Sequence, residues 1–387
     1  MKRLLIVFLI ITSLSIQTSY ALEALPQSFT RHVNSKFLSN PSVILVDQAN
    51  MEVVYQNSKN RPRTPASVLK IFSTAAIALT LDSKTTFKTT LYKTNKKGVF
   101  VISGEYDPWI TSSVRYRNAN NRAYMPRLIK AAFASNKKLK KVTLIYKGVS
   151  GSDIYQAKKA LKRRASVAYK PISKGVAVES LITEKITSIE SPPLEKMIRF
   201  ALLYSDNVLS QKLAMLAARK SGFPLTKKGL NQTIKSKVSE LGVDTTGMRF
   251  IDGSGLSNRN KVSASTVSQL LLKVKIDPRL KPIYDHLPIS GESGTLASRF
   301  IDTAPQAIGL VRAKTGSIRG TVSLAGFATS GEKEYVFVVL ADGVGRTRSL
   351  QDAARRAIDR MLGTITQPPV TGITPPTPES TPFTTTE

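Results

Sequence analysis

The sequence predicts an α+β protein, and three stretches of the chain carry this prediction. Residues 43–46 and 53–55 are rich in β-branched residues and flank a short polar loop, which predicts an antiparallel hairpin. Residues 194–218 carry two consecutive apolar helical patterns, and strand patterns return at residues 322–327 and 335–340. With 387 residues, of which 41% are hydrophobic, the chain can bury a sizeable core in one large domain or two smaller ones.

The chain begins with the pattern of an exported protein. Met1-Lys2-Arg3 is a short basic start, residues 4–11 are an apolar run, and Ser19-Tyr20-Ala21 is a small-x-small cleavage site. Together they predict a secretory signal peptide over residues 1–21. No other stretch is long and apolar enough to cross a bilayer. We therefore expect an exported protein of the periplasm or the cell-wall space.

The composition of the chain limits the classes of molecule that it is expected to bind. The formal net charge is +31, from 57 Lys and Arg against 26 Asp and Glu. Outside a cell, such a surface meets anionic cell-envelope polymers, although a solvated basic surface with no single partner is the alternative. The lysines are scattered rather than clustered with aromatic residues, so no nucleic-acid partner is indicated. The absence of cysteine excludes a disulfide framework and thiolate metal sites.

The most informative stretch runs from Thr64 to Phe72 and predicts the start of a buried helix. Thr64 suits the N-cap, Pro65 suits the first helical turn, and an apolar run follows. Ser67 and Lys70 are three residues apart, so they share one face of this helix. A buried lysine loses its proton more readily, and a neutral amine can deprotonate a serine hydroxyl. The pair can therefore be a nucleophile and its base, although Ser-x-x-Lys also occurs twice in polar, surface-type sequence.

The segment after this helix predicts a small domain of its own. Residues 87–106 have strand character, residues 126–134 have a helical pattern that begins at a proline, and residues 142–146 predict a further strand. Residues 147–190 are only weakly periodic, and no element is predicted there. The single tryptophan, Trp109, could line a groove, but we expect it in the core.

A polar turn follows between two buried helices. Ser205-Asp206-Asn207 separates the helical pattern of residues 194–202 from that of residues 208–218. A polar turn held by two core helices can present a hydroxyl and an amide to a site. The alternative is that one of the three residues simply caps the second helix.

Two glycine-marked loops and a short extended segment follow. Residues 252–257 match neither a phosphate loop nor a nucleophile elbow, and turn chemistry accounts for them and for residues 287–296. Lys314-Thr315-Gly316 starts an extended segment. It can offer an ammonium, a hydroxyl and open backbone groups to an extended peptide, or it can be an exposed strand end. The strands of residues 322–340 and a helix over residues 350–362 complete the chain's predicted elements.

Three of these motifs together resemble the signature of penicillin-binding proteins and serine β-lactamases. They are Ser67-x-x-Lys70, Ser205-Asp206-Asn207 and Lys314-Thr315-Gly316, in this order and on a predicted helix start, helix break and strand. The resemblance covers most of residues 40–362. It is strongest to the D-alanyl-D-alanine carboxypeptidase/endopeptidase branch, the class C low-molecular-mass penicillin-binding proteins, through Pro65-Ala66-Ser67, Asp252-Gly253-Ser254-Gly255-Leu256-Ser257, Gly294-Thr295-Leu296 and Ala313-Lys314-Thr315-Gly316.

The resemblance implies an antiparallel sheet with a helical subdomain that carries an inserted small domain. The implied catalytic domain comprises residues 22–85 and 192–363, and the implied insert comprises residues 86–191. Residues 364–387 are rich in Thr and Pro and have no Lys or Arg, so we expect a disordered tail.

The resemblance also implies a reaction. Ser67 would attack the carbonyl between two D-alanines of a peptidoglycan stem peptide and form an acyl-enzyme, with Lys70 as the base. Lys314 would place a second cation nearby and help to keep Lys70 neutral. Ser205 would relay a proton to the leaving amine, and Asn207 would orient the substrate or Lys70. No cofactor is implied.

The same resemblance implies how the substrate is held. Lys314 and Thr315, with Gly316 and Ser317 following on the strand, would bind the terminal carboxylate. Backbone N–H groups of Ser67 and Ser317 would form the oxyanion hole. β-Lactam antibiotics would then be covalent inhibitors, and peptidoglycan stem peptides the substrates.

Two other functions stay open. A β-lactamase needs fast deacylation, and no motif for a deacylating carboxylate is seen. An inactive cell-wall-binding protein is the other possibility, although every residue that the chemistry needs is present. His32 and His286 are the only histidines and neither lies in a matching motif, so a histidine triad and a metal site are both unsupported.

Overall fold

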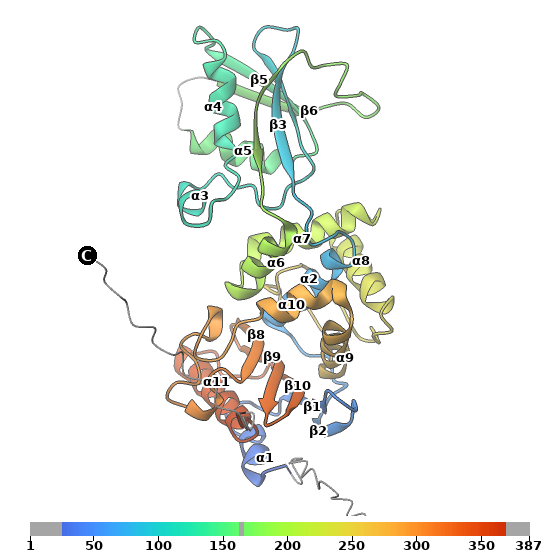
Figure 1. The fold of residues 1–387 in the computed structure, drawn as a ribbon, viewed down its shortest axis with the longest axis vertical. Coiled ribbons are helices and arrows are strands. Elements are labelled where there is room, and N and C mark those ends of the chain that lie inside the picture. The colour runs from blue at the N-terminus through green and yellow to red at the C-terminus, as the bar shows by residue number, and fades with distance from the viewer. Residues whose placement is uncertain (1–24, 162–165, 369–387) are drawn as a thin grey trace, which may run out of the picture.

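The computed structural model describes residues 25–161 and 166–368. The molecule is elongated, with a larger body at one end and a smaller unit, formed by the strands between residues 88 and 190, at the other (Figure 1). The predicted signal peptide lies outside the described residues, and so do residues 369–387 of the predicted tail. Within the described ranges, none of the helices has the length and apolar character needed to cross a bilayer.

The body is built around an antiparallel sheet of five strands in the order β2-β1-β10-β9-β8. The first strand of the chain pairs with the last one, in a register that sets Ile44 opposite Val338. All six residues of β1 are buried, which explains the apolar run of residues 43–46 in its middle. The strands are Ser42–Asp47 (β1), Val53–Asn57 (β2), Val311–Ile318 (β8), Thr321–Ser330 (β9) and Lys333–Ala341 (β10).

Helices cover both faces of this sheet (Figure 1). Val43 and Leu45 of β1 belong to the core under α1 (Gln27–Val33) and α11 (Arg348–Gly363). Ile44 and Val46 alternate with them and belong to the core on the opposite face, where α9 (Ala264–Ile276) packs. The sheet therefore separates a thin two-helix layer from a larger helical group.

The larger helical group surrounds one short helix, α2 (Lys70–Ala78), which continues the 3₁₀ turn η1 (Ala66–Leu69). Every residue of α2 is buried, so its few polar side chains need partners inside the protein. Ser73, for example, donates to the carbonyl of Gly253 at 2.8 Å. The helices packed around α2 are Leu194–Leu203 (α6), Asn207–Lys220 (α7), Lys227–Ser239 (α8) and Lys281–His286 (α10).

The smaller unit has its own mixed sheet, in the order β6-β5-β4-β3-β7. Strand β5 is parallel to β4 and β6, whereas β3 is antiparallel to β4 and β7. The chain leaves the body and returns to it side by side, because Ser191 N donates to Phe87 O at 2.9 Å and Leu194 N donates to Thr85 O at 2.8 Å. The elements are Lys88–Lys93 (β3), Val99–Ser103 (β4), Val114–Asn120 (α3), Pro126–Ala134 (α4), Lys141–Lys147 (β5), Gly151–Ala160 (α5), Ser166–Pro171 (β6) and Lys185–Glu190 (β7).

Several local predictions can be compared with these elements. The predicted helix over residues 126–134 is confirmed as α4, and the predicted strand over residues 142–146 lies within β5. Residues 147–190, where nothing was predicted, contain α5, β6 and β7. Trp109 is buried, as expected for a core residue.

Two expectations, one about the start of a helix and one about the C-terminal tail, differ from the structure. Thr64 does not cap the helix: Pro65 occupies the position before η1, and no side chain caps that turn. The start of the predicted tail packs against the body, because Ile365 and Thr366 are buried and Gln367 pairs with Ser330. The Thr64 hydroxyl is used elsewhere, because it donates to Asn258 O at 3.0 Å and accepts from Lys261 Nζ at 2.9 Å.

Candidate active site

The centre of the candidate site is the side chain of Lys70, the first residue of α2. Its Nζ lies 2.8 Å from Ser67 Oγ, 2.7 Å from Asn207 Oδ1 and 2.6 Å from the carbonyl oxygen of Ser254. An ammonium can donate to all three, which uses every hydrogen it has. A neutral amine can keep the two other bonds and accept the hydroxyl proton of Ser67 in the same position. The geometry therefore suits a serine with an adjacent base.

The environment makes the neutral form of this amine easier to reach than in a free lysine. Burial lowers the pKa of Lys70 to about 8, against the opposing influence of Asp252 and Asp206. Lys314 is fully buried, and burial together with the nearby charge of Lys70 holds its pKa well below the ordinary value. We expected the charge of Lys314 to help keep Lys70 neutral. In the structure, burial is instead the main cause of the lowered pKa of Lys70.

The backbone that carries Ser67 is held in a strained conformation. Ala66 has a φ of 48°, which costs a residue with a Cβ atom about 1–2 kcal/mol. Such a conformation persists only where the surroundings impose it. A Cβ atom at Gly255 would lie 2.0 Å from Ala66 O, and one at Gly316 would lie 2.6 Å from Pro65 O. Two glycines thus let the backbone close on Ser67 from both sides.

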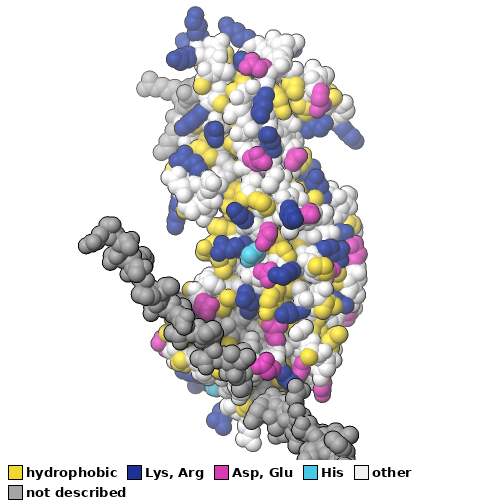
Figure 2. Space-filling view, in the orientation of Figure 1, with side chains coloured by type: hydrophobic (Ala, Val, Ile, Leu, Met, Phe, Trp, Pro, Cys, Tyr) yellow, Lys and Arg dark blue, Asp and Glu magenta, His cyan; other side chains and the backbone are white. Residues whose placement is uncertain are grey.

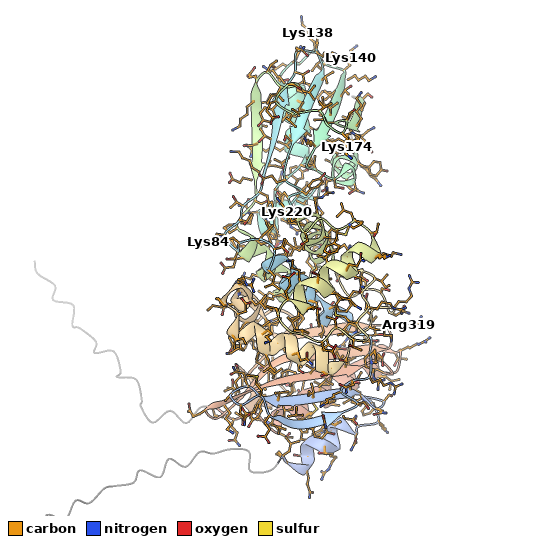
Figure 3. The ribbon with its side chains drawn as sticks, turned by 90° about the vertical axis from the view of Figure 1, so that its right-hand side faces the viewer. Lys84, Lys138, Lys140, Lys174, Lys220 and Arg319 are labelled. Carbon is orange, nitrogen blue, oxygen red and sulfur yellow. The ribbon has the colours of Figure 1, made fainter. Side chains whose placement is uncertain are left out.

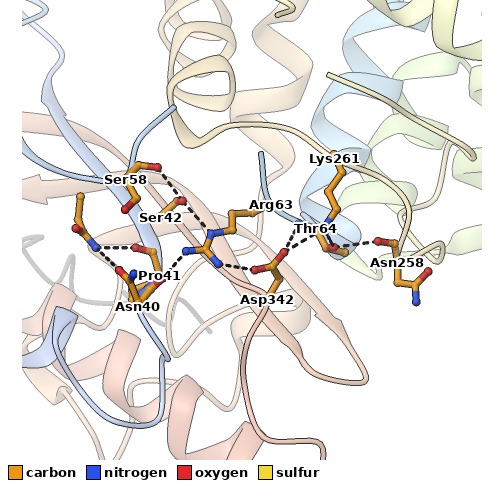
Figure 4. A network of polar contacts seen from close by, with 10 residues as sticks. Asn40, Pro41, Ser42, Ser58, Arg63, Thr64, Asn258, Lys261 and Asp342 are labelled. Carbon is orange, nitrogen blue, oxygen red and sulfur yellow. Dashed lines mark hydrogen bonds and ion pairs between the residues drawn. The ribbon is translucent and has the colours of Figure 1, made fainter. Parts of the chain in front are cut away.

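A buried ion pair fixes the segment that leads into Ser67 (Figure 4). Asp342, just after β10, accepts from Arg63 Nη1 at 2.8 Å, from Thr64 N at 3.0 Å and from Lys261 Nζ at 3.2 Å. Burial alone would raise the pKa of Asp342, but the bonds from Thr64, Arg63 and Lys261 together lower it. Thr64 Oγ1 also donates to Asn258 O at 3.0 Å. This network ties the sheet, the segment before Ser67 and the loop after residue 252 to one another.

The loop of residues 252–257 is organised by one carboxylate. Asp252 accepts from the N–H groups of Ser254 at 2.8 Å, Gly255 at 2.6 Å and Ser257 at 2.9 Å, and from Asn260 Nδ2 at 3.0 Å. Burial raises the pKa of Asp252, but these donors and the Ser254 hydroxyl together lower it, so the carboxylate stays charged. The loop held in this way presents the Ser254 carbonyl to Lys70.

The polar turn between α6 and α7 divides its three residues between different tasks. Asp206 is the N-cap of α7 and accepts from Leu209 N at 2.8 Å. Asn207 is the first residue of α7, and its side chain reaches Lys70. Ser205 has a φ of 56° and is half-buried, and its hydroxyl makes no hydrogen bond with any residue that the structure describes. The capping alternative therefore holds for Asp206 alone.

Strand β8 lies along the edge of the site. Lys314 Nζ lies 3.1 Å from Thr315 O, and Thr315 Oγ1 donates to Thr295 Oγ1 at 2.8 Å. Ser317 is exposed, and its hydroxyl accepts from Arg355 Nη2 of α11 at 2.8 Å. β8 is the outermost strand of the sheet. Its first residues bond to the segment of residues 288–290, through Ser290 N to Val311 O at 2.9 Å and Ala313 N to Pro288 O at 2.8 Å, so the part of this edge from Thr315 onward can pair with an extended peptide.

The structure thus joins some predicted site residues directly and leaves others nearby. Ser67, Lys70 and Asn207 share hydrogen bonds, and Lys314 is close enough to Lys70 for its charge to be felt. No hydrogen bond links Ser205 to them within the described chain. The sequence did not reveal the supporting residues Asp252, Asp342 and Thr295. Only the Asp-Gly-Ser-Gly pattern and the Gly-Thr-Leu pattern hinted that two of them lay in ordered turns.

Among the described residues, no group of three or more His, Asp or Glu side chains could hold a metal ion. A serine bonded to a lysine at the start of a buried helix, beside a five-stranded antiparallel sheet, defines the class of serine hydrolases that includes the penicillin-binding proteins and serine β-lactamases. Residues 30–117 and 159–365 match the model of the D-Ala-D-Ala carboxypeptidase 3 (S13) family. The chain belongs to this family of hydrolases.

Similar proteins agree with this assignment. The chain is 27% identical over 379 residues to carboxypeptidase DacB of Mycolicibacterium smegmatis. The match covers 84% of this chain and 82% of that protein. Its fold resembles penicillin binding protein 4 (dacB) of Haemophilus influenzae, with a TM-score of 0.67, 18% identity and coverage of 84% of this chain and 95% of the other. It also resembles a predatory endopeptidase of Bdellovibrio bacteriovorus, with a TM-score of 0.61, 17% identity and coverage of 86% and 95%.

Proposed function

We propose that this protein is a serine D-Ala-D-Ala carboxypeptidase or endopeptidase that cuts peptidoglycan stem peptides through an acyl-enzyme on Ser67. The observation that carries the proposal is the contact between the Lys70 amine and the Ser67 hydroxyl in a buried setting that lowers the pKa of the amine. Membership of the D-Ala-D-Ala carboxypeptidase family supports the substrate class.

In the acylation step, Ser67 Oγ forms a bond with the carbonyl carbon between two D-alanines. Lys70 takes the hydroxyl proton, and the N–H groups of Ser67 and Ser317 stabilise the oxyanion. The C–N bond then breaks, and the leaving amine takes a proton that Ser205 relays from Lys70. The hydroxyl of Ser205 has no partner among the described residues, which leaves it free for this task. Asn207 holds the Lys70 amine in place throughout.

In the deacylation step, water attacks the ester carbonyl. The C–O bond to Ser67 breaks, the serine recovers its proton, and the peptide leaves with a new carboxylate. Lys314 and Thr315, with Gly316 and Ser317 beside them on β8, hold the carboxylate at the end of the substrate. In the free protein the Thr315 hydroxyl donates to Thr295 Oγ1, and it turns its proton toward the carboxylate when the substrate binds. β-Lactam antibiotics acylate the same serine.

We also propose a setting for this enzyme. The basic start, apolar run and small-x-small site of residues 1–21 support export to the periplasm or the cell-wall space. The net charge of +31 supports contact with anionic envelope polymers. The separate sheet between residues 88 and 190 supports an inserted domain over residues 86–191, within a catalytic domain of residues 22–85 and 192–363.

The test is intact-mass analysis of the mature protein after exposure to benzylpenicillin, beside the variant Ser67→Ala. We expect one covalent adduct on the wild type and none on the variant. An unmodified protein with unchanged antibiotic would contradict the proposal and favour a binding protein, and an unmodified protein with hydrolysed antibiotic would favour a β-lactamase. Release of D-alanine from a stem pentapeptide and cleavage of a cross-linked dimer then measure the two activities separately.

A further inference from the structure

A basic cavity lies where the smaller unit meets α6, outside the arrangement around Lys70. Its volume is about 1190 Å³, which is large for a small-molecule pocket. It lies between the α3–α4 region and α6, which face each other in Figure 1. Glu190 is the one carboxylate among the described lining residues, and the cations that line the cavity are Arg117, Arg122, Arg127, Lys130, Lys196 and Arg199.

Five of the six cations of this cavity have no carboxylate partner in the described part of the chain, and Arg117 and Arg122 lie over aromatic rings. Within the described ranges, Arg122 alone of the six forms an ion pair, at 3.7 Å from Asp206. The Arg122 side chain is 5% exposed, and its buried Nε has no hydrogen-bond partner in the described part of the chain. A buried donor left without a partner is costly, and an anion entering the cavity would supply one.

Two observations distinguish this cavity from the rest of the basic surface. Figure 2 shows Lys and Arg side chains spread over both units rather than gathered in one patch, whereas this cavity concentrates six of them around one space. Arg122, Arg127 and Lys130 also lie in residues 118–158, between the two segments that match the family model. Three of the six cations of the cavity therefore come from outside the segments that match the family model.

The cavity is also connected to the candidate active site. Tyr204 lines it and directly precedes Ser205, and the Arg122 guanidinium contacts Asp206, the cap of the helix that begins with Asn207. A ligand in the cavity thus lies next to the turn that carries two of the proposed site residues. A substrate that extends from the catalytic serine past this turn would enter it.

We propose that this cavity binds carboxylate groups of the peptidoglycan substrate that lie away from the bond being cut. The inference rests on the proposed function for its choice of ligand. Four of the six cations are arginines, whose planar fork suits bidentate pairing with carboxylates. The cavity makes the enzyme favour long, carboxylate-rich stem peptides over a minimal D-Ala-D-Ala peptide.

The test uses the full chain and a charge-reversed cavity, Arg127→Glu with Lys130→Glu. Both side chains are exposed on α4, and neither has a partner among the described residues. The matched control is Lys138→Glu with Lys140→Glu, which makes the same charge change at the far end of the smaller unit (Figure 3). The substrates are a cross-linked stem-peptide dimer and an acylated D-Ala-D-Ala peptide whose only carboxylate is terminal.

We expect the cavity variant to raise the KM for the dimer about tenfold, with kcat, the short peptide and benzylpenicillin acylation unchanged. The control should leave all of them unchanged. An unchanged KM in the cavity variant, or an equal rise in the control, would overturn the proposal. Inorganic polyphosphate provides a further test. If it inhibits the wild type competitively, and the cavity variant loses this inhibition but keeps the wild-type KM for the dimer, then a phosphate polymer is the occupant and the proposal is overturned.

Binding can be measured apart from catalysis. Trp109 is the only tryptophan and lines the cavity, so its fluorescence reports occupancy in the inactive variant Ser67→Ala. A saturable change with the dimer, lost when Arg127→Glu and Lys130→Glu are added, supports the proposal even if the benzylpenicillin test fails. No change with the dimer overturns it even if the benzylpenicillin test succeeds.

Discussion

At the scale of single residues, the protonation of Lys70 controls the proposed nucleophile. Burial lowers the pKa of this amine to about 8, so the neutral base is the minor form at pH 6 and the major form at pH 9. We expect the rate of acylation by benzylpenicillin to rise with pH and to level off above about 8. A rate that stays constant between pH 6 and 9 would contradict this assignment.

The variant Lys70→Arg tests the same residue chemically. An arginine keeps its positive charge at these pH values, so it cannot accept the Ser67 proton. General-base catalysis contributes roughly 10²- to 10⁴-fold, and we expect the acylation rate to fall by at least about 100-fold. Lys212→Arg is the matched control, because Lys212 is a partly buried lysine that donates to Asp153 at 2.8 Å. Acylation in the control should stay near the wild-type rate, and retained acylation in Lys70→Arg would exclude Lys70 as the base.

Asp252 supports this site through the loop that it organises. In Asp252→Asn, an amide N–H₂ replaces one carboxylate oxygen and faces N–H donors, so a bond is lost and a donor is left unpaired. We expect the free energy of unfolding to fall by about 2 kcal/mol and acylation to slow, because the Ser254 carbonyl no longer holds Lys70. Denaturant unfolding and acylation rates measure the two effects.

The control for this change is Asp244→Asn. Asp244 accepts from Thr246 N at 2.8 Å in a local turn, but it is exposed and lies outside the loop of residues 252–257. We expect a small change in stability and no change in acylation. Equal effects of the two substitutions would show that the loop does not act through Lys70.

At the scale of elements, the close approach of one loop to η1 is open to a direct test. An alanine Cβ at Gly255 would lie 2.0 Å from Ala66 O, on a backbone with a φ of 89°. We expect Gly255→Ala to lose most acylation activity, because the loop or the Ser67 backbone must move. Gly175→Ala separates the two causes, since Gly175 has a φ of 86° and no atom within 4 Å of the added Cβ. It should cost only about 1 kcal/mol in unfolding free energy and leave acylation intact.

Local sequence patterns predicted those elements whose character is decided within a few residues. The α4 helix begins at a proline and has an apolar stripe, and its bounds follow from these features. The Ser67–Lys70 contact follows from helical spacing alone. The identity of the cap could not be read from Ser205-Asp206-Asn207, because all three residue types suit an N-cap and only the path of the chain selects Asp206.

The remaining features depend on residues that are distant in sequence. Strand β6 is half-exposed and has weak periodicity, and it is a strand because β5 is beside it. Asp342 contacts Arg63 across most of the chain, and no local pattern pairs them. The third partner of Lys70 is a backbone carbonyl, which carries no sequence signal.

At the scale of the whole molecule, the seam between the two units contains a buried acid. Asp107 accepts from the Ser191 hydroxyl and from Trp109 N, which links the loop after β4 to the segment that returns to the body. Burial raises the pKa of Asp107 to about 6, against the lowering effects of its donors and Lys212. Folding thus favours the protonated acid, and the stability it contributes is full below pH 4 and is lost as the pH rises through about 6.

We expect Asp107→Asn to remove this pH dependence, because the amide is neutral at every pH. The wild type should lose roughly 3 kcal/mol of unfolding free energy between pH 4 and 7, and the variant should lose less. Urea unfolding followed by Trp109 fluorescence, at pH 4 and 7, measures the difference at the seam. If the unfolding free energy changes equally with pH in the two proteins, Asp107 does not titrate in this range.

The pairing of the first strand with the last one has a consequence for the folding of the chain during its synthesis. While a ribosome is still adding residues, β1 has only β2 beside it, because β10 is among the last segments to be made. The sheet cannot close, and Lys314 cannot come near Lys70, until almost the whole polypeptide is available. We therefore expect a chain that stops before β10 to lack hydrolase activity.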